Sequence, residues 1–237
     1  MPKALLRLRP LDDRSLPSVT FVEASGMLTV RGDQWANTIV VTDDGTAGPG
    51  AVTVQADGLS YTSQSALTRI RVIGWNGADS VEYHLTGDLT ADLAGNVGAG
   101  GRLELWVYGG NGEDTLSVGG AGGGVAADGR LDVRLFGGNG RDVVGVDLTG
   151  VWAGDVNVAL WGGNGTDTLS ADLTAAAGST GTVKARVFGG NGVDTLTLLT
   201  ARAATDDPVS FDAAVNGGNG KDVFTSSDGV RVVDLPR

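Results

Sequence analysis

A six-residue turn, Gly-Gly-Asn-Gly-x-Asp, recurs along this chain with its flanking residues in fixed register. Five full copies begin at Gly109, Gly137, Gly162, Gly189 and Gly217. A degenerate copy runs from Gly74 to Asp79, and a vestigial one from Gly32 to Asn37. The acidic position falls at Asp79, Asp114, Asp142, Asp167, Asp194 and Asp222. Neighbouring aspartates are 25 to 35 residues apart, a period that indicates a stacked repeat protein.

Apolar residues alternate with other residues on both sides of each turn. The third full copy, for example, is preceded by Val156, Val158 and Leu160 and followed by Leu169 and Leu173. Period-two alternation is the pattern of a strand with one buried face. Each repeat is therefore predicted to be a strand, a glycine-rich turn, a second strand and a looser connection.

Two all-β architectures satisfy this pattern. In the first, each repeat is one coil of a parallel β-helix or wide β-roll solenoid of about seven coils. In the second, each repeat is a hairpin of an antiparallel meander, because Asn-Gly is a strong hairpin-turn signal. Stacked coils place each residue on its counterpart, which explains why the third turn position is always asparagine from the degenerate copy onward. This identity favours the solenoid.

The predicted domain organisation is a short leader followed by one repeat domain. Residues 1–20 form the leader, and residues 21–237 form a single β-solenoid with turns near 32, 74, 109, 137, 162, 189 and 217. Within the leader, Leu11–Pro17 resembles the short Arg/Leu-rich N-terminal motif of some bacterial surface proteins. The long spacers 43–68 and 86–101 are expected to be loops or extra strands at one edge. Caps are expected at the divergent first copy and after Phe224.

Composition narrows the function classes. The formal net charge of −11 disfavours nucleic-acid binding and suits metal cations or solubility. Cysteine is absent, which excludes disulfides and thiolate chemistry. No run of about 18 apolar residues is present, so no membrane span is expected.

The turn and the residues after it, GGNGxDTL in Gly109–Leu116 and Gly162–Leu169, resemble the GGxGxDxUx nonapeptide of the RTX, or haemolysin-type, calcium-binding repeats. The resemblance implies a bacterial protein, secreted or on the cell surface, in which calcium lies between neighbouring turns on backbone carbonyls and aspartates. Besides the six aspartates, it assigns to the metal sites Gly109, Asn111, Gly137, Asn139, Gly162, Asn164, Gly189, Asn191, Gly217 and Asn219.

The spacing departs from that family, whose turns follow every nine residues and load both edges of each coil. Here the turn returns mostly every 25 to 28 residues, so only one edge of a wider roll would hold calcium, in at most five sites. The alternative is a metal-free turn, in which the aspartates accept turn N–H groups and the asparagines form an amide ladder. Arg141 and Lys221, each directly before an aspartate, favour this alternative by offsetting charge.

A second feature lies just before the first glycine of four turns, on the outward face of the strand. These positions predict an exposed aromatic ladder of Tyr108, Phe136, Trp161 and Phe188, with Arg134 and Arg186 on the same face. Such a ladder binds cell-surface glycans or partner proteins, or its rings simply pack on one another at the corner.

No catalytic constellation is apparent. His84 is the only histidine and is expected at the surface, and the repeated carboxylates follow one edge instead of facing across a cleft. The sequence therefore predicts a non-enzymatic calcium-binding structural repeat protein, extracellular or on a bacterial surface. The alternative is an adhesion module that binds glycan or protein through the aromatic ladder, with metal-free turns.

Overall fold

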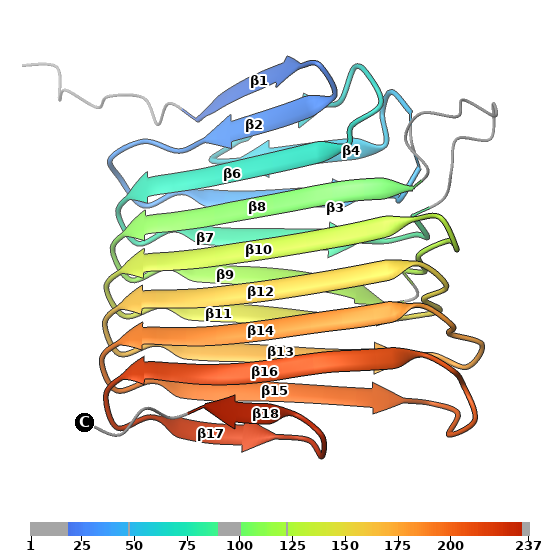
Figure 1. Ribbon diagram of the computed structural model, residues 1–237. Coiled ribbons are helices and arrows are strands. Elements are labelled where there is room, and N and C mark those ends of the chain that lie inside the picture. Colours follow the sequence, from blue (N-terminus) through green and yellow to red (C-terminus); the bar gives the residue numbers. More distant parts are fainter. Residues whose placement is uncertain (1–18, 47, 90–100, 122, 234–237) are drawn as a thin grey trace, which may run out of the picture.

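The computed structural model describes residues 19–46, 48–89, 101–121 and 123–233 of the 237-residue chain. These residues form strands, turns and loops and contain no helix, and hence no helix that could cross a membrane. Two nine-stranded sheets lie face to face, and the chain passes from one to the other in each coil (Figure 1). The fold is a flattened, largely parallel β-solenoid.

The first sheet, which we call sheet A, is the nearer one in Figure 1. In spatial order it consists of β1 (Thr20–Ala24), β2 (Met27–Arg31), β6 (Arg69–Asn76), β8 (Arg102–Asn111), β10 (Arg130–Asn139), β12 (Asp155–Asn164), β14 (Thr182–Asn191), β16 (Ser210–Asn219) and β18 (Arg231–Val233).

The second sheet, sheet B, lies behind it. In the reverse spatial order it consists of β5 (Leu59–Thr62), β4 (Val52–Ala56), β3 (Thr38–Asp43), β7 (Ser80–Leu85), β9 (Thr115–Ala121), β11 (Val143–Gly150), β13 (Thr168–Ala175), β15 (Thr195–Arg202) and β17 (Val223–Ser226).

Strand register confirms the solenoid and excludes the meander. β10 pairs in parallel with both β8 and β12, and Asn139 lies opposite Asn111 on one side and Asn164 on the other. The six-residue turns join sheet A to sheet B along one edge, at the left in Figure 1. About four coils are regular, β8–β9 through β14–β15, which is fewer than the seven predicted. The earlier and later coils have shortened strands.

The core lies between the two sheets. The inward residues of the alternating pattern, such as Leu105, Leu135, Leu160 and Leu169, are fully buried. Most core side chains are Val, Leu, Ile or Ala, because inward positions of neighbouring coils stack directly on one another and similar side chains pack well there. The exceptions among the largest buried side chains are Trp152 and Tyr83.

Both ends of the solenoid depart from the regular coil. At the N-terminal end, β1 pairs antiparallel with β2, and β4 and β5 extend sheet B as antiparallel strands. The spacer 43–68 therefore does contain extra strands, as expected. At the other end, β17 and β18 are short and exposed. Short or reversed end strands limit the unpaired edge that a parallel stack presents.

Two predicted segments fall partly outside the described residues. Most of the leader (1–18) and most of the second spacer (90–100) lie there. Of residues 1–20, only Val19 and Thr20 are described, and Thr20 already begins β1.

Candidate functional site

The stacked turns form a column along one edge of the solenoid, and their glycines are required by geometry. In the turn at Gly109, the second and fourth residues, Gly110 and Gly112, have φ angles of +119° and +142°. Residues with a side chain rarely adopt positive φ angles. A Cβ on Gly112 would also lie 1.7 Å from the carbonyl oxygen of Gly77 in the preceding coil. The glycines therefore permit both the turn and the close stacking of coils.

The asparagines form a continuous amide ladder on the solvent side of the column. Each Nδ2 donates to the Oδ1 of the asparagine in the preceding coil at 2.7 Å. The ladder runs through Asn76, Asn111, Asn139, Asn164, Asn191 and Asn219. This is the ladder that the metal-free alternative predicts, and it directs the asparagine side chains toward one another.

The aspartates lie on the core side of the same turns. Asp79, Asp114, Asp142, Asp167 and Asp194 are at most 2% exposed. The Oδ1 atom of each turn aspartate accepts a hydrogen bond from a backbone N–H of the preceding coil, at 2.8 to 2.9 Å. The donor residues are Asn37, Asp79, Asp114, Asp142, Asp167 and Asp194. The structure thus does not bring the aspartate and asparagine side chains together in one ligand set.

The second carboxylate oxygen is the unusual feature of the site. In all six aspartates, including Asp222, the Oδ2 atom is buried and receives no hydrogen bond from the described residues. A buried carboxylate oxygen without a donor is costly, because nothing replaces its lost hydration. Six identical cases in one column indicate a property of the repeat itself.

In five of the six turns, the Oδ2 atom converges with a backbone carbonyl. A Cβ built on Gly109 would lie 2.4 Å from Oδ2 of Asp114 and 2.6 Å from the carbonyl oxygen of Gly137 in the next coil. The same pair of contacts recurs at Gly74, Gly137, Gly162 and Gly189. The first glycine is therefore required because one carboxylate oxygen and one carbonyl oxygen pack where a side chain would begin.

This donor set fits a hard cation in its chemistry. Calcium prefers carboxylate and carbonyl oxygens, and both kinds of oxygen meet here. Among the residues that the structure describes, no three His, Cys, Asp or Glu side chains gather around one point. Beyond the aspartates, carbonyls such as those of Gly109, Gly137, Gly162, Gly189 and Gly217, together with water, would have to complete the shell.

Burial also changes the acidity of these aspartates. Loss of hydration raises the pKa of Asp79 and of Asp142 to about 6, although a backbone N–H opposes the shift and neighbouring carboxylates add to it. The same cause raises the pKa of Asp114, Asp167 and Asp194. The column therefore either holds protons or favours a cation that neutralises it.

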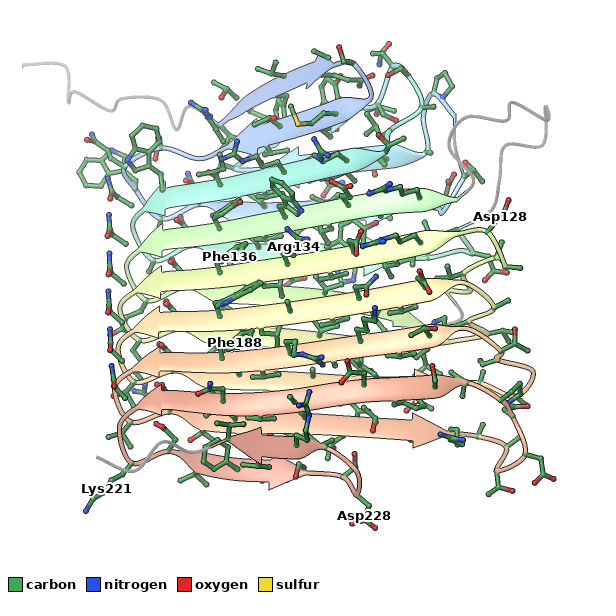
Figure 2. The ribbon with its side chains drawn as sticks, viewed as in Figure 1. Asp128, Arg134, Phe136, Phe188, Lys221 and Asp228 are labelled. Carbon is green, nitrogen blue, oxygen red and sulfur yellow. The ribbon has the colours of Figure 1, made fainter. Side chains whose placement is uncertain are left out.

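The aromatic ladder is present on the outer face of sheet A. Tyr108, Phe136, Trp161 and Phe188 stack face to face, with centroid distances of 4.8, 4.4 and 5.5 Å along the series. The rings are half-buried, so they do pack on one another, as the structural alternative expects. Figure 2 labels Phe136, Phe188 and Arg134 on this face.

Arg134 was expected on this face from the sequence, whereas Arg69, Arg71 and Trp106 were not identified. Arg71 lies 5.2 Å from the centre of the Tyr108 ring, and Arg69 and Arg134 lie 5.2 and 5.5 Å from that of Trp106. Their alternation marks them as outward, but only strand register shows which of them are neighbours. His84 is on the outer face of sheet B, exposed and 3.3 Å from Glu82, as predicted for a surface residue.

Comparisons of this chain with protein-family models, with curated proteins and with solved structures found no match.

Proposed function

We propose that this protein is a non-enzymatic structural repeat protein whose stacked turns bind calcium between neighbouring coils. The observation that carries the proposal is the column of six buried Oδ2 atoms without donors, five of which converge with a glycine carbonyl. When bound, calcium supplies positive charge to the buried carboxylates. The turn motif's resemblance to RTX repeats points the same way.

The proposed ligands are the Oδ2 atoms of the six turn aspartates and the carbonyl oxygens of the first turn glycines. The asparagines are assigned a different role, because their side chains are used in the amide ladder. Their backbone carbonyls are also engaged, as in the hydrogen bond from Gly112 to Asn139 at 2.8 Å.

A calcium-rich location suits such sites. Each coil contributes a single carboxylate, and calcium affinity is weaker when fewer of the ligands are charged. We therefore place the protein outside the cell or on a bacterial cell surface, where millimolar calcium fills weak sites. Binding only to the folded state would then couple folding to export.

The arrangement of the acids supports a role without catalysis. The turn aspartates follow one another along a single edge at the spacing of the coils, and each bonds to the coil before it. General acid–base chemistry needs acid and base groups that converge on one substrate position.

Thermal unfolding in millimolar calcium and in excess chelator tests the proposal. Calcium at about a hundred times its dissociation constant adds about 2.7 kcal/mol for each site, so the melting temperature is expected to rise clearly. Magnesium at the same concentration is the control and should give a much smaller shift, because it resists dehydration. Equal melting temperatures in calcium and in chelator would contradict the proposal and leave a metal-free solenoid.

A matched pair of variants separates the two states of the turn. Asp167→Asn keeps the Oδ1 acceptor but replaces Oδ2 with an amide NH₂ group, which can donate a hydrogen bond to the carbonyl oxygen of Gly189. It should stabilise the chelated protein and reduce the calcium-induced shift. Asp128→Asn removes the same charge from an exposed position in the turn before β10 and should change neither quantity. A loss of stability in chelator on Asp167→Asn would show that the bare turn needs the carboxylate.

A further inference from the structure

The basic residues of the solenoid are concentrated on one face. In the strands of sheet B the only Lys or Arg is Arg202. In sheet A, by contrast, the outward positions carry Arg31, Arg69, Arg71, Arg102, Arg130, Arg134, Lys184, Arg186 and Arg231. The acidic residues among these positions are fewer: Glu104, Asp132, Asp155 and Asp212. A chain with a net charge of −11 thus presents one positively charged face.

Strand register places four of these arginines in one straight column. Arg71 lies beside Trp106, which lies beside Arg134, and Arg134 is followed by Ala159, Arg186, Ala214 and Arg231. An arginine therefore occupies every second coil. Because neighbouring strands are about 4.8 Å apart, the Cα atoms of these arginines repeat about every 10 Å along the solenoid axis.

A groove lies at the centre of this column. It has a volume of about 390 Å³, and the small side chain of Ala159 allows it to form between Arg134 and Arg186. Trp161 lines it on the side of the aromatic ladder, and Lys184 and Asn157 line it on the other side. Four cationic side chains therefore line the groove, Arg130, Arg134, Lys184 and Arg186, together with one acidic side chain, Asp132.

Not all of these cations are neutralised within the protein. Arg186 pairs with Asp212 at 2.6 Å, and Arg130 pairs with Asp132. Arg134 and Lys184, both exposed, form no ion pair with any residue that the structure describes. Arg134 is held over the Trp106 ring instead, which leaves its guanidinium available for an external anion.

The aromatic ladder adds to the preference for anions. Its rings stack on one another, and Arg71 lies over the ring of Tyr108, so the ring faces are largely occupied. The solvent therefore meets ring edges, which carry partial positive charge. Because the ring faces are covered by neighbouring rings, nucleic-acid bases and neutral sugars have little free ring surface on which to stack.

We propose that this face binds an extended acidic polysaccharide that runs along the solenoid axis. A carboxylate or sulfate group would be bound between Arg134 and Arg186 in the groove over Ala159, with Lys184 beside it. Arg71 and Arg231 would contact the chain further along. Arginine suits this role because its planar fork binds carboxylate and sulfate groups with two parallel hydrogen bonds.

The two-coil repeat selects this ligand class. Acidic groups on every second sugar of an extended chain point to the same side and recur over one disaccharide, a length comparable to the spacing of the arginine Cα atoms, from which the long side chains can reach them. Nucleic acid fits less well: strand phosphates in a duplex are about 3.4 Å apart, and single strands bind by stacking bases on free aromatic faces. A folded acidic protein has no reason to match a straight, regular column of cations.

Binding of purified full-length protein to soluble polysaccharides tests the proposal. The probes are polygalacturonate as a carboxylated chain, heparin as a sulfated chain, dextran as a neutral chain and single-stranded DNA. We expect binding to at least one acidic polysaccharide that weakens with added salt, and no binding to dextran. Comparing the first two identifies the anionic group. Binding to dextran or to DNA equal to that of the acidic chains, or no binding at all, would overturn the proposal.

Two variants locate the site. Arg134→Ala should weaken binding about tenfold, the effect of losing one charge-assisted hydrogen-bonded contact. Arg141→Ala removes the same charge from an exposed turn outside this face and should leave binding within about twofold. Equal effects of the two variants would contradict the assignment.

Folding must be followed alongside binding. Ala159→Glu adds a negative charge to the groove floor and should abolish binding, with circular dichroism reporting that the solenoid is intact. Every assay is repeated in calcium and in chelator, because polyuronates bind calcium themselves. Binding in both buffers supports the groove independently of the proposed metal sites, and binding only in calcium to folded protein would contradict direct recognition by the arginines.

Discussion

At the scale of single residues, the turn motif combines three separate physical requirements. The second and fourth glycines supply positive φ angles, and the first glycine leaves space for the aspartate Oδ2 and a carbonyl of the next coil. The degenerate turn keeps the positive φ angle without the glycine, because Trp75 replaces the second glycine and has a φ of +91°. A side chain in this region strains the backbone by about 1 to 3 kcal/mol.

In a strand an alanine variant is usually more stable than a glycine variant, and we expect the reverse at Trp75. Trp75→Gly should be more stable than Trp75→Ala by about 1 kcal/mol, because both lose the same exposed indole but only glycine relieves the strained φ. Chemical denaturation of the two variants measures the difference. At Ser170, an outward position on β13 without a positive φ, alanine should be the more stable substitution. A preference for alanine at both positions would refute the argument.

At the scale of elements, the column of turns is held by repeated contacts between identical residues. Asn164 takes part in two ladder hydrogen bonds, one with Asn139 and one with Asn191. Asn219, at the end of the ladder, takes part in one, with Asn191. The ladder is exposed, so each bond contributes at the lower end of the usual range.

Removing a ladder amide should therefore cost more in the middle than at the end. Asn164→Ala is expected to lower the free energy of unfolding by about 1 kcal/mol, and Asn219→Ala by about half as much. Equilibrium unfolding in urea measures both. If the two variants lose equal stability, the ladder does not act through its individual hydrogen bonds.

The connections on the opposite edge show a different relation between sequence and structure. The turn edge repeats one six-residue motif, whereas the other edge joins the coils by loops of unequal length and by the extra strands β4 and β5. Unequal loops change the number of residues in a coil without changing the register of its strands. The spacing of motifs therefore varies although the coils stack evenly.

At the scale of the whole molecule, charge is distributed by face and edge. Basic residues gather on the outer face of sheet A, and buried carboxylates form a column along the turn edge. Burial raises the pKa of Asp79 and Asp142 to about 6, above their ordinary value of 3.8. At pH values between the ordinary pKa and the raised pKa, the folded protein binds more protons than the unfolded chain, so its stability decreases as pH rises.

The chelated protein is therefore expected to be more stable at about pH 5 than at about pH 7.5, which is the reverse of the behaviour of ion-paired carboxylates. Glu104 and Asp212, whose pKa values are lowered by arginine partners, oppose this trend only at more acidic pH. Melting temperatures across this range provide the measurement, and Asp142→Asn should flatten the profile. Stability that increases steadily toward pH 7.5 in chelator would contradict the argument, because it would show that burial does not raise the pKa of these aspartates.

Much of the fold follows from the sequence by itself. The repeated turn and the period-two alternation predict stacked strands, the core positions and the need for glycine, because each depends on local backbone geometry and the side from which water is excluded. The identity of Asn111, Asn139 and Asn164 correctly predicts in-register stacking. The number of regular coils was overestimated, because the motif persists where strands are shortened.

Only the tertiary structure decided how these repeated groups face one another. It directs the asparagines to solvent and the aspartates to the core, and it leaves one carboxylate oxygen of each aspartate without a donor. It also decides the partners of the outward arginines, because Arg134 lies over the Trp106 ring whereas Arg186 pairs with Asp212. The physical reason is that alternation and register assign each side chain to a face and a column, whereas its partners depend on the rotamer that it adopts among the neighbouring coils.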